Sequence, residues 1–80
     1  MVEDERLLNA CVLLKVMPTK ADAILSALKA IKGVRKAYFA YGRFDIVVFL
    51  EVEDYKELRK ITGLINAING IRSTETLAEA

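Results

Sequence analysis

Histidine and tryptophan are absent from this chain, and cysteine and proline occur only once each. Without histidine, no side chain has an ordinary pKa near neutral pH, so general acid–base catalysis there has little support. The single cysteine, Cys11, excludes an internal disulfide, and together with the lack of histidine it argues against a zinc or iron–sulfur site. We therefore expect no metal, no cofactor and no enzymatic activity.

Long apolar runs and an excess of one charge are absent as well. No stretch approaches the roughly 20 residues of a membrane-spanning helix, and the charged opening Met1–Arg6 is unlike a signal peptide. The net charge of +1 supplies no overall field that would attract nucleic acid or a membrane surface. We expect a cytoplasmic protein that binds neither DNA nor membranes.

Eighty residues allow one small domain, and 54% of them are hydrophobic. A domain of this size buries only roughly 60% of its unfolded surface, so a partner is a common source of further stability. We expect a single domain over residues 1–80, with its core at about 8–78. Cys11 lies within an apolar run, which favours an inert core thiol over a reactive one.

The two halves of the chain resemble each other at a shift of 37 residues, which superposes apolar residues and a glycine. The shift places Leu13 on Leu50, Ile24 on Ile61, Ala30 on Ala67 and Gly33 on Gly70. Each half reads as a strand, an amphipathic helix, a glycine and a second strand. Two such units predict a ferredoxin-like βαββαβ sandwich, with a four-stranded antiparallel sheet in the order 4-1-3-2 and both helices on one face.

The hydrophobic pattern gives the elements and their ends. We expect strands at Leu8–Met17, Val34–Tyr41, Phe44–Val52 and Ile71–Ala78. Thr19 is expected to cap the first helix and Asp54 the second, where Glu57 completes a capping box. Gly33 is expected to end the first helix with a positive φ.

The sequence also predicts the roles of two further glycines. Gly42 with Arg43 is expected to form a tight turn between the second and third strands. Gly63 lies inside the second helix, where glycine costs about 1 kcal/mol relative to alanine, and close packing of that helix on the sheet is the expected compensation. The basic residues of the same helix are interpreted as a solvated face: Lys56, Arg59 and Lys60.

The first and third strands are apolar on both faces. A strand with one wet face alternates apolar and polar residues, but Ala10–Leu14 and Ile46–Leu50 contain no polar break. In the order 4-1-3-2 these strands are central, and the helices cover only one face of the sheet. We therefore predict that the open face is covered by a second subunit, sheet on sheet, in a homodimer or larger assembly.

The segment from Tyr41 to Asp45 holds the best candidate ligand site. Gly42 permits a sharp reversal with exposed backbone groups, and Asp45 stands at the start of an apolar strand. One interpretation is ordinary turn chemistry, in which Asp45 closes the hairpin by accepting hydrogen bonds from backbone amides. The other is a carboxylate that holds the ammonium group of a ligand, with the turn amides near the ligand's carboxylate.

The fourth strand provides the second candidate. Thr74 and Thr76 have the same parity, so both hydroxyl groups project from one face. Either they keep an edge strand polar against aggregation, or they bind a ligand. The residues alone leave both interpretations open.

Other functions of this fold lack their motifs. Met17–Lys20 stands where acylphosphatases have a glycine-rich, arginine-bearing loop and metal chaperones have C-x-x-C. An RNA-recognition motif needs exposed aromatic side chains on the central strands, but Phe44 and Phe49 have opposite parity and the first strand has no aromatic residue. A ferredoxin-like monooxygenase or isomerase needs a pocket on the sheet face, which the apolar side chains fill.

The Gly42-x-x-Asp45 turn, with Gly33–Tyr38 before it and Ile46–Val48 after it, resembles the effector-binding (RAM) domain of the Lrp/AsnC regulators, the feast/famine proteins. The ending Asn69–Thr76 resembles the fourth strand of that family. The resemblance covers roughly residues 10–78, which is nearly the whole chain.

The resemblance implies the βαββαβ fold and subunits that pair through their sheets. It also implies that dimers assemble into rings, often octamers or decamers, with small effectors, usually amino acids, bound between dimers. Carried over by position, the ligand-binding residues on one side would be Tyr41, Gly42 and Asp45. A neighbouring subunit would supply Ser73, Thr74 and Thr76.

The full-length regulators also carry an N-terminal helix-turn-helix domain, whereas only a short segment precedes the first strand here. We therefore expect a stand-alone module without direct DNA binding. Our hypothesis is an amino-acid sensor whose ligand shifts the equilibrium among assembly states. The alternative is a ligand-free structural subunit that joins a full-length Lrp/AsnC regulator and modulates its oligomer.

Overall fold

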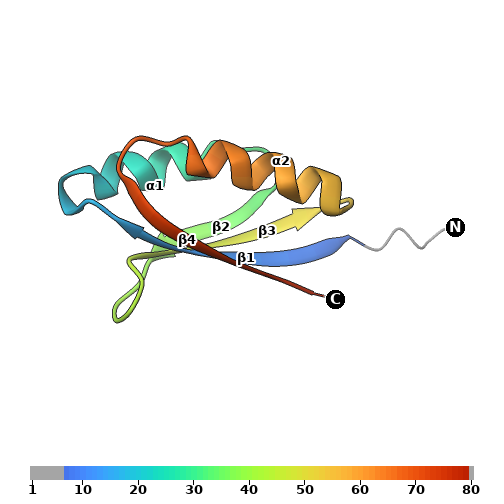
Figure 1. Ribbon diagram of the computed structural model, residues 1–80, viewed down its shortest axis with the longest axis horizontal. Helices are drawn as coiled ribbons and strands as arrows, with labels where there is room; N and C mark the ends of the chain where they lie inside the picture. The colour runs from blue at the N-terminus through green and yellow to red at the C-terminus, as the bar shows by residue number, and fades with distance from the viewer. Residues whose placement is uncertain (1–6, 80) are drawn as a thin grey trace, which may run out of the picture.

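Four strands and two α-helices make up residues 7–79, the part of the chain that the computed structural model describes (Figure 1). In chain order they are β1 (Leu8–Val16), the short 3-10 helix η1 (Pro18–Lys20), α1 (Ala21–Lys29), β2 (Val34–Phe39), β3 (Ile46–Val52), α2 (Tyr55–Asn66) and β4 (Ile71–Ala78). The charged lead-in expected at Met1–Arg6 lies outside the described residues. Neither helix of the described part is long and apolar enough to cross a membrane.

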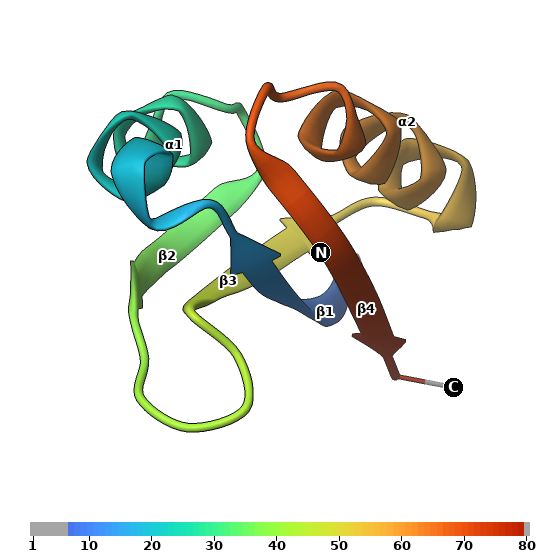
Figure 2. The ribbon, with the colours of Figure 1, turned by 60° about the vertical axis from the view of Figure 1, so that its left-hand side comes forward.

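The strands form one antiparallel sheet in the order β2-β3-β1-β4. This order confirms the predicted ferredoxin-like α+β fold, with β1 and β3 in the centre. Both helices lie on the same face of the sheet, as two views of the ribbon show (Figures 1 and 2). The opposite face, here called the open face, is covered by no helix of residues 7–79 (Figures 1 and 2).

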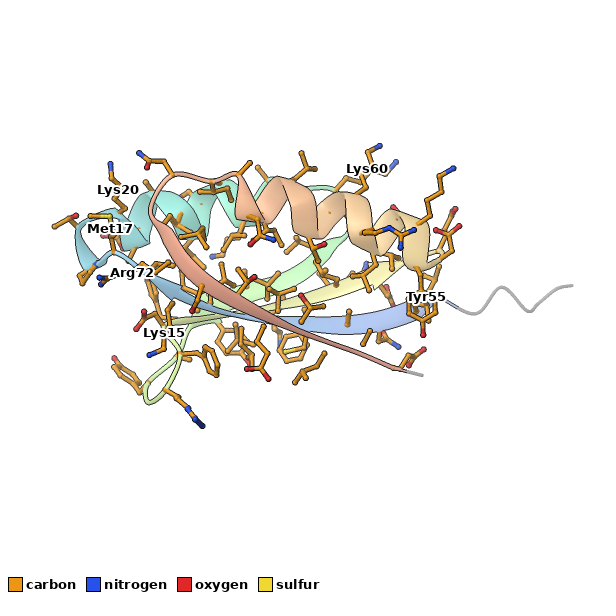
Figure 3. The ribbon with its side chains drawn as sticks, in the orientation of Figure 1. Lys15, Met17, Lys20, Tyr55, Lys60 and Arg72 are labelled. Carbon is orange, nitrogen blue, oxygen red and sulfur yellow. The ribbon has the colours of Figure 1, made fainter. Side chains whose placement is uncertain are left out.

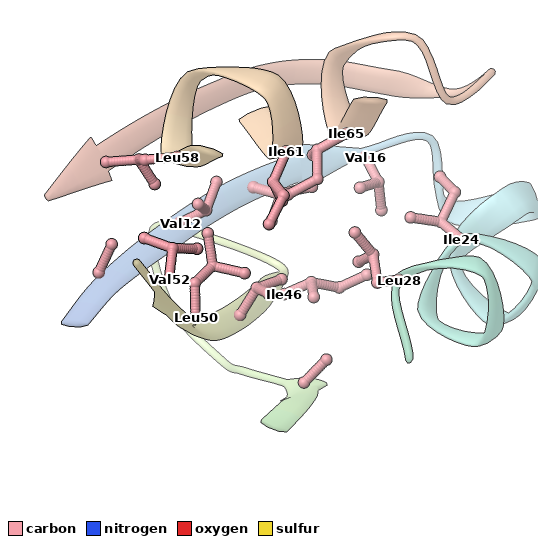
Figure 4. Packing of buried hydrophobic residues seen from close by; sticks show 14 residues of the cluster. Val12, Val16, Ile24, Leu28, Ile46, Leu50, Val52, Leu58, Ile61 and Ile65 are labelled. Atoms are coloured by element: carbon pink, nitrogen blue, oxygen red, sulfur yellow. The ribbon is translucent and has the colours of Figure 1, made fainter. Parts of the chain in front are cut away.

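The hydrophobic core fills the space between the helices and the sheet (Figure 4). Every second residue of the central strands points into it, because side chains alternate along a strand. The most deeply buried members, each at most 1% exposed, come from four elements: Val12, Leu14, Ile24, Leu28, Ile46, Val48, Val52 and Ile65. The spacing of Leu58, Ile61 and Ile65 gives α2 one apolar stripe toward this core.

The internal repeat holds for the helices but not for the strands that precede them. Ile24 and Ile61, superposed at a shift of 37 residues, are both buried. Leu13, however, lies half-buried on the open face, whereas Leu50 is buried in the core. The strands superpose face to face when Val12 is placed on Val48, a shift of 36 residues, which is one fewer than the shift that superposes the helices.

The two helix starts differ. The Asp54 cap is confirmed: its Oδ1 accepts a hydrogen bond from the Glu57 amide at 2.8 Å, and Glu57 Oε1 accepts one from the Glu53 amide at 2.8 Å. The Thr19 cap is wrong, because α1 begins after Lys20 without a side-chain cap. Pro18, with its fixed φ, starts η1 directly after β1, so Thr19 lies within that turn.

The glycines that directly precede β2 and β4 are the ones in close contact with their surroundings. Gly33 has the predicted positive φ of +102°, and Gly70 has a φ of +101°. The expectation that Gly33 ends the first helix is wrong, because α1 ends at Lys29 with Ala30 as its C-cap. A Cβ atom at Gly33 would lie 2.7 Å from Cδ1 of Ile61. At Gly63, beyond its own turn of α2, no atom of the described residues lies within 4 Å of a Cβ position. The expected close packing at Gly63 is therefore wrong.

Replacing Gly63 with alanine is expected to stabilise the domain by about 0.5–1 kcal/mol, because alanine has less backbone freedom to lose in a helix and the added methyl group meets open space. Urea unfolding followed by circular dichroism measures the change in the free energy of unfolding. A loss of stability at subunit concentrations where the protein associates would instead mean that another subunit packs closely against this turn of α2.

Candidate functional site

A six-residue loop, residues 40–45, replaces the tight turn expected at Gly42 and Arg43. It connects β2 to β3 and extends beyond the end of the sheet (Figure 2). Its base is closed by the Ala40 amide, which donates to the Asp45 carbonyl oxygen at 2.9 Å. Gly42 has a φ of +116° at the tip, and the neighbouring Tyr41 is 100% exposed. The loop therefore presents an aromatic side chain that no described residue covers.

Asp45 connects this loop to β1. Its amide donates to the Leu14 carbonyl oxygen at 2.8 Å, and its Oδ2 accepts a hydrogen bond from the Val16 amide at 2.9 Å. β1 extends beyond the first residue of β3, so the Val16 amide has no carbonyl oxygen of β3 opposite it. The Asp45 carboxylate accepts that hydrogen bond instead. This bond crosses to another strand rather than joining amides within the loop. Oδ1 accepts no hydrogen bond from residues 7–79, so it remains available to a ligand.

Tyr41 and Asp45 line a hollow of about 350 Å³ between the loop and the start of α1, here called the α1 hollow. The rest of its wall is apolar: Val16, Pro18, Ala21, Phe39 and Ala40. The wall includes one carboxylate, one phenol and no cationic side chain. Such a lining suits a small molecule that has an apolar part and a positively charged group.

The fourth-strand candidates do not share one face. Thr74 pairs with Leu14 and Thr76 with Val12, which places both threonines on the helix side of the sheet. Thr74 Oγ1 donates to Asn66 Oδ1 at 3.0 Å and is therefore already hydrogen-bonded. Ser73 has the opposite parity and lies on the open face, away from both threonines.

Thr76 lines a second hollow, about 200 Å³, between α2 and β4, here called the α2 hollow. Its other wall residues are Tyr55, Leu58, Arg59 and Thr62. Thr76 lies opposite Val12, four residues along β1 from Val16, whose amide holds Asp45. This separation is about 13 Å along the strand. One chain therefore does not bring Asp45 and Thr76 together on one small ligand.

Residues 9–78 match the model of one protein family, the Lrp/AsnC ligand binding domain. The chain belongs to this family. The match confirms the resemblance drawn from the Gly42-x-x-Asp45 turn and the fourth strand. It describes a ligand-binding domain of regulatory proteins rather than a catalytic one.

Solved structures agree with this assignment. The protein TTHA0845 from Thermus thermophilus is 27% identical, with a TM-score of 0.87 over 91% of this chain and 92% of that chain. PHS023 from Pyrococcus horikoshii is 28% identical, with a TM-score of 0.83 over 91% of this chain and 89% of that chain. AsnC from E. coli is 19% identical and shares the fold, with a TM-score of 0.85. The match covers 99% of this chain but only 58% of the AsnC chain. A comparison with curated protein sequences gave no match.

In this Lrp/AsnC domain, Arg59 is a candidate that the sequence interpretation did not select. Together with Lys56 and Lys60 it was expected on a solvated helix face, and all three are exposed. Arg59 also lines the α2 hollow. Lys60 points away from the sheet, whereas Tyr55 points down from the first turn of α2 toward the strands (Figure 3). The spacing of Tyr55, Arg59 and Thr62 places all three on one stripe of α2. This periodicity is the sequence pattern that could have identified Arg59 as a site candidate.

The open face of the Lrp/AsnC domain carries apolar side chains from all four strands. They are Cys11, Leu13, Tyr38, Val47, Phe49 and Leu77. The rings of Tyr38 and Phe49 lie 6.1 Å apart between centroids, and both side chains are about 40% exposed. Cys11 was expected in the core but is half-buried on this face, where desolvation raises the pKa of its thiol.

Proposed function

We propose that this Lrp/AsnC domain is a ligand-sensing module that binds an amino acid with an apolar side chain. The ammonium group of the ligand binds Asp45 Oδ1, and its side chain lies against Phe39 and Pro18 in the α1 hollow. The observation that carries the proposal is a single carboxylate on an otherwise apolar wall, already held in place by the Val16 amide. A carboxylate fixed before binding loses little conformational entropy when a ligand arrives.

The same proposal includes a homodimer formed through the open face. Contiguous apolar side chains on a monomer surface are typical of protein–protein contacts, and Tyr38, Phe49 and Leu77 are 39–53% exposed here. Dimers then assemble into a larger ring, such as an octamer or decamer, with the effector between dimers. Ligand binding modulates that assembly, or a transcription regulator joined to it, through the difference in affinity between assembly states.

Replacing Asp45 with asparagine is expected to weaken binding of apolar amino acids by at least about tenfold. The asparagine oxygen still accepts the Val16 hydrogen bond, but the charge that attracts the ammonium group is lost, and a charged hydrogen bond contributes about 1.5–3 kcal/mol. Native mass spectrometry with the twenty amino acids identifies the ligand, and calorimetry then compares affinities. The dimer is expected to remain intact.

Asp22→Asn is the matched control, because Asp22 lies next to Ala21 but does not line the α1 hollow. Unchanged affinity in Asp45→Asn would show that the site is wrong. If no amino acid binds at all, and the protein purifies with a helix-turn-helix homologue, the structural-subunit alternative is favoured.

A further inference from the structure

A hollow of about 310 Å³ lies along β2, the outer strand of the sheet, beside the last residue of α1; it is here called the β2 hollow. Its wall contains three cationic side chains, those of Lys29, Arg35 and Lys36, and the apolar side chains of Val34 and Ala37. Among residues 7–79, no carboxylate lines it. The β2 hollow shares no residue with the α1 hollow, which lies at the opposite ends of α1 and β2.

A β-bulge in β2 brings two consecutive cations to this hollow. The pairing with β3 advances by two residues on β2, from Val34 to Lys36, while it advances by one residue on β3, so Arg35 is an extra residue in the strand. Regular alternation would direct Arg35 and Lys36 to opposite faces of the sheet, whereas both line the β2 hollow. Bulges of this kind often lie beside binding sites, where they redirect a side chain.

The cations of the β2 hollow outnumber the carboxylates near them. Nε of Arg35 lies 3.3 Å from Oε1 of Glu51, in the salt bridge that residues 7–79 contain. Lys29 and Lys36 have no acidic partner among these residues, and Nζ of Lys36 lies 5.9 Å from the centroid of the Tyr38 ring. Three cations against one carboxylate leave an excess of two positive charges. A dianion would neutralise this excess.

We propose that the β2 hollow binds a small organic dianion, either a phosphomonoester or a dicarboxylate. The planar guanidinium of Arg35 can donate two parallel hydrogen bonds to a phosphate or a carboxylate group. Lys29 lies in the last turn of α1, so its ammonium group also offsets the partial negative charge of the helix end, which would otherwise oppose an anion there. The site lies within one subunit and does not depend on the proposed function.

Three small anions test the site. Methyl phosphate and succinate are the dianionic probes, and acetate is the monoanion for comparison, all at one ionic strength because salt screens exposed charges. Amide NMR shifts at Lys29, Arg35 and Lys36 measure binding, and at least one dianion is expected to shift them at concentrations where acetate does not. A response to methyl phosphate alone identifies a phosphate ligand, a response to succinate alone a dicarboxylate, and a response to both the dianion class.

Two opposite effects are expected from substitutions in and beside the hollow. Lys29→Gln and Arg35→Gln are each expected to weaken binding of the dianion by about three- to tenfold, through the loss of one charged contact. Glu51→Gln is expected to strengthen it, because this change removes the carboxylate that competes with the ligand for Arg35. A purely structural role of the Arg35–Glu51 salt bridge would not produce such a gain.

Lys56→Gln is the matched control, because it removes the same charge from an exposed position of α2 that lines none of the three hollows. Equal losses in Lys56→Gln and Lys29→Gln would overturn the inference, since they would show a general effect of net charge. It also fails if neither dianion shifts the three amides, or if acetate shifts them equally. Asp45→Asn is expected to leave dianion binding unchanged, so this site and the proposed amino-acid site can fail separately.

Discussion

Replacing Gly33 with alanine is expected to destabilise the domain by about 2–3 kcal/mol. Two costs combine: the φ of +102° disfavours any residue with a Cβ atom, and that Cβ would lie 2.7 Å from Cδ1 of Ile61. Ile61 is only 3% exposed, so its side chain has little room to move. Urea unfolding of the variant and the parent measures the difference in the free energy of unfolding.

Gly42→Ala separates the two costs, since Gly42 also has a positive φ, of +116°, but no described atom lies within 4 Å of a Cβ there. This control is expected to lose only about 1 kcal/mol, from the backbone alone. An equal loss in both variants would mean that the contact with Ile61 contributes nothing and that backbone conformation explains the whole effect at Gly33.

Val47→Lys is expected to weaken association of the dimer by at least about 100-fold. Val47 lies on the open face of a central strand, between Leu13 of β1 and Tyr38 of β2, so no carboxylate faces it on the neighbouring strands. In the proposed dimer the ammonium group would be buried without a partner, once in each subunit, and each such charge costs several kcal/mol. Sedimentation equilibrium measures the dissociation constant, and circular dichroism checks that the fold is retained.

Leu64→Lys provides the comparison for this prediction. Leu64 is 51% exposed on α2, in the helix layer on the other side of the sheet, and the same change there should leave the dimer intact. A Val47→Lys protein that associates as tightly as the parent would show that the subunits do not pair through the open face.

Features encoded by neighbouring residues were predictable from the sequence. The Asp54 cap involves residues three and four positions apart, and the positive φ at Gly33 follows from a single residue type. The sheet order followed from the two βαβ units, since few arrangements of such units exist. The unbroken apolar run in each central strand also indicated that the open face would carry apolar side chains, as it does.

Features that depend on contacts between distant residues were not predictable. The predicted cap at Thr19 rested on neighbouring residues alone. The turn that Pro18 starts takes its place, and the Met17 amide fixes that turn by donating a hydrogen bond to the distant Gly70 carbonyl oxygen. The Asp45 carboxylate bonds to an amide 29 residues earlier in the chain. The position of Arg59 beside Thr76 depends on how α2 crosses β4. Sequence patterns contain no direct signal for such pairs.

The order of the strands also has a consequence for the time course of folding. β1 is the first strand to be synthesised, yet it pairs with β3 and with β4, which is the last. The pairing of Ala10 with Ala78 joins residues near opposite ends of the sequence, and sheets rich in such non-local pairings fold slowly for their size. A nascent chain must therefore keep apolar β1 unpaired along one edge until β4 has left the ribosome, and during that interval the unpaired edge is open to contacts with other chains.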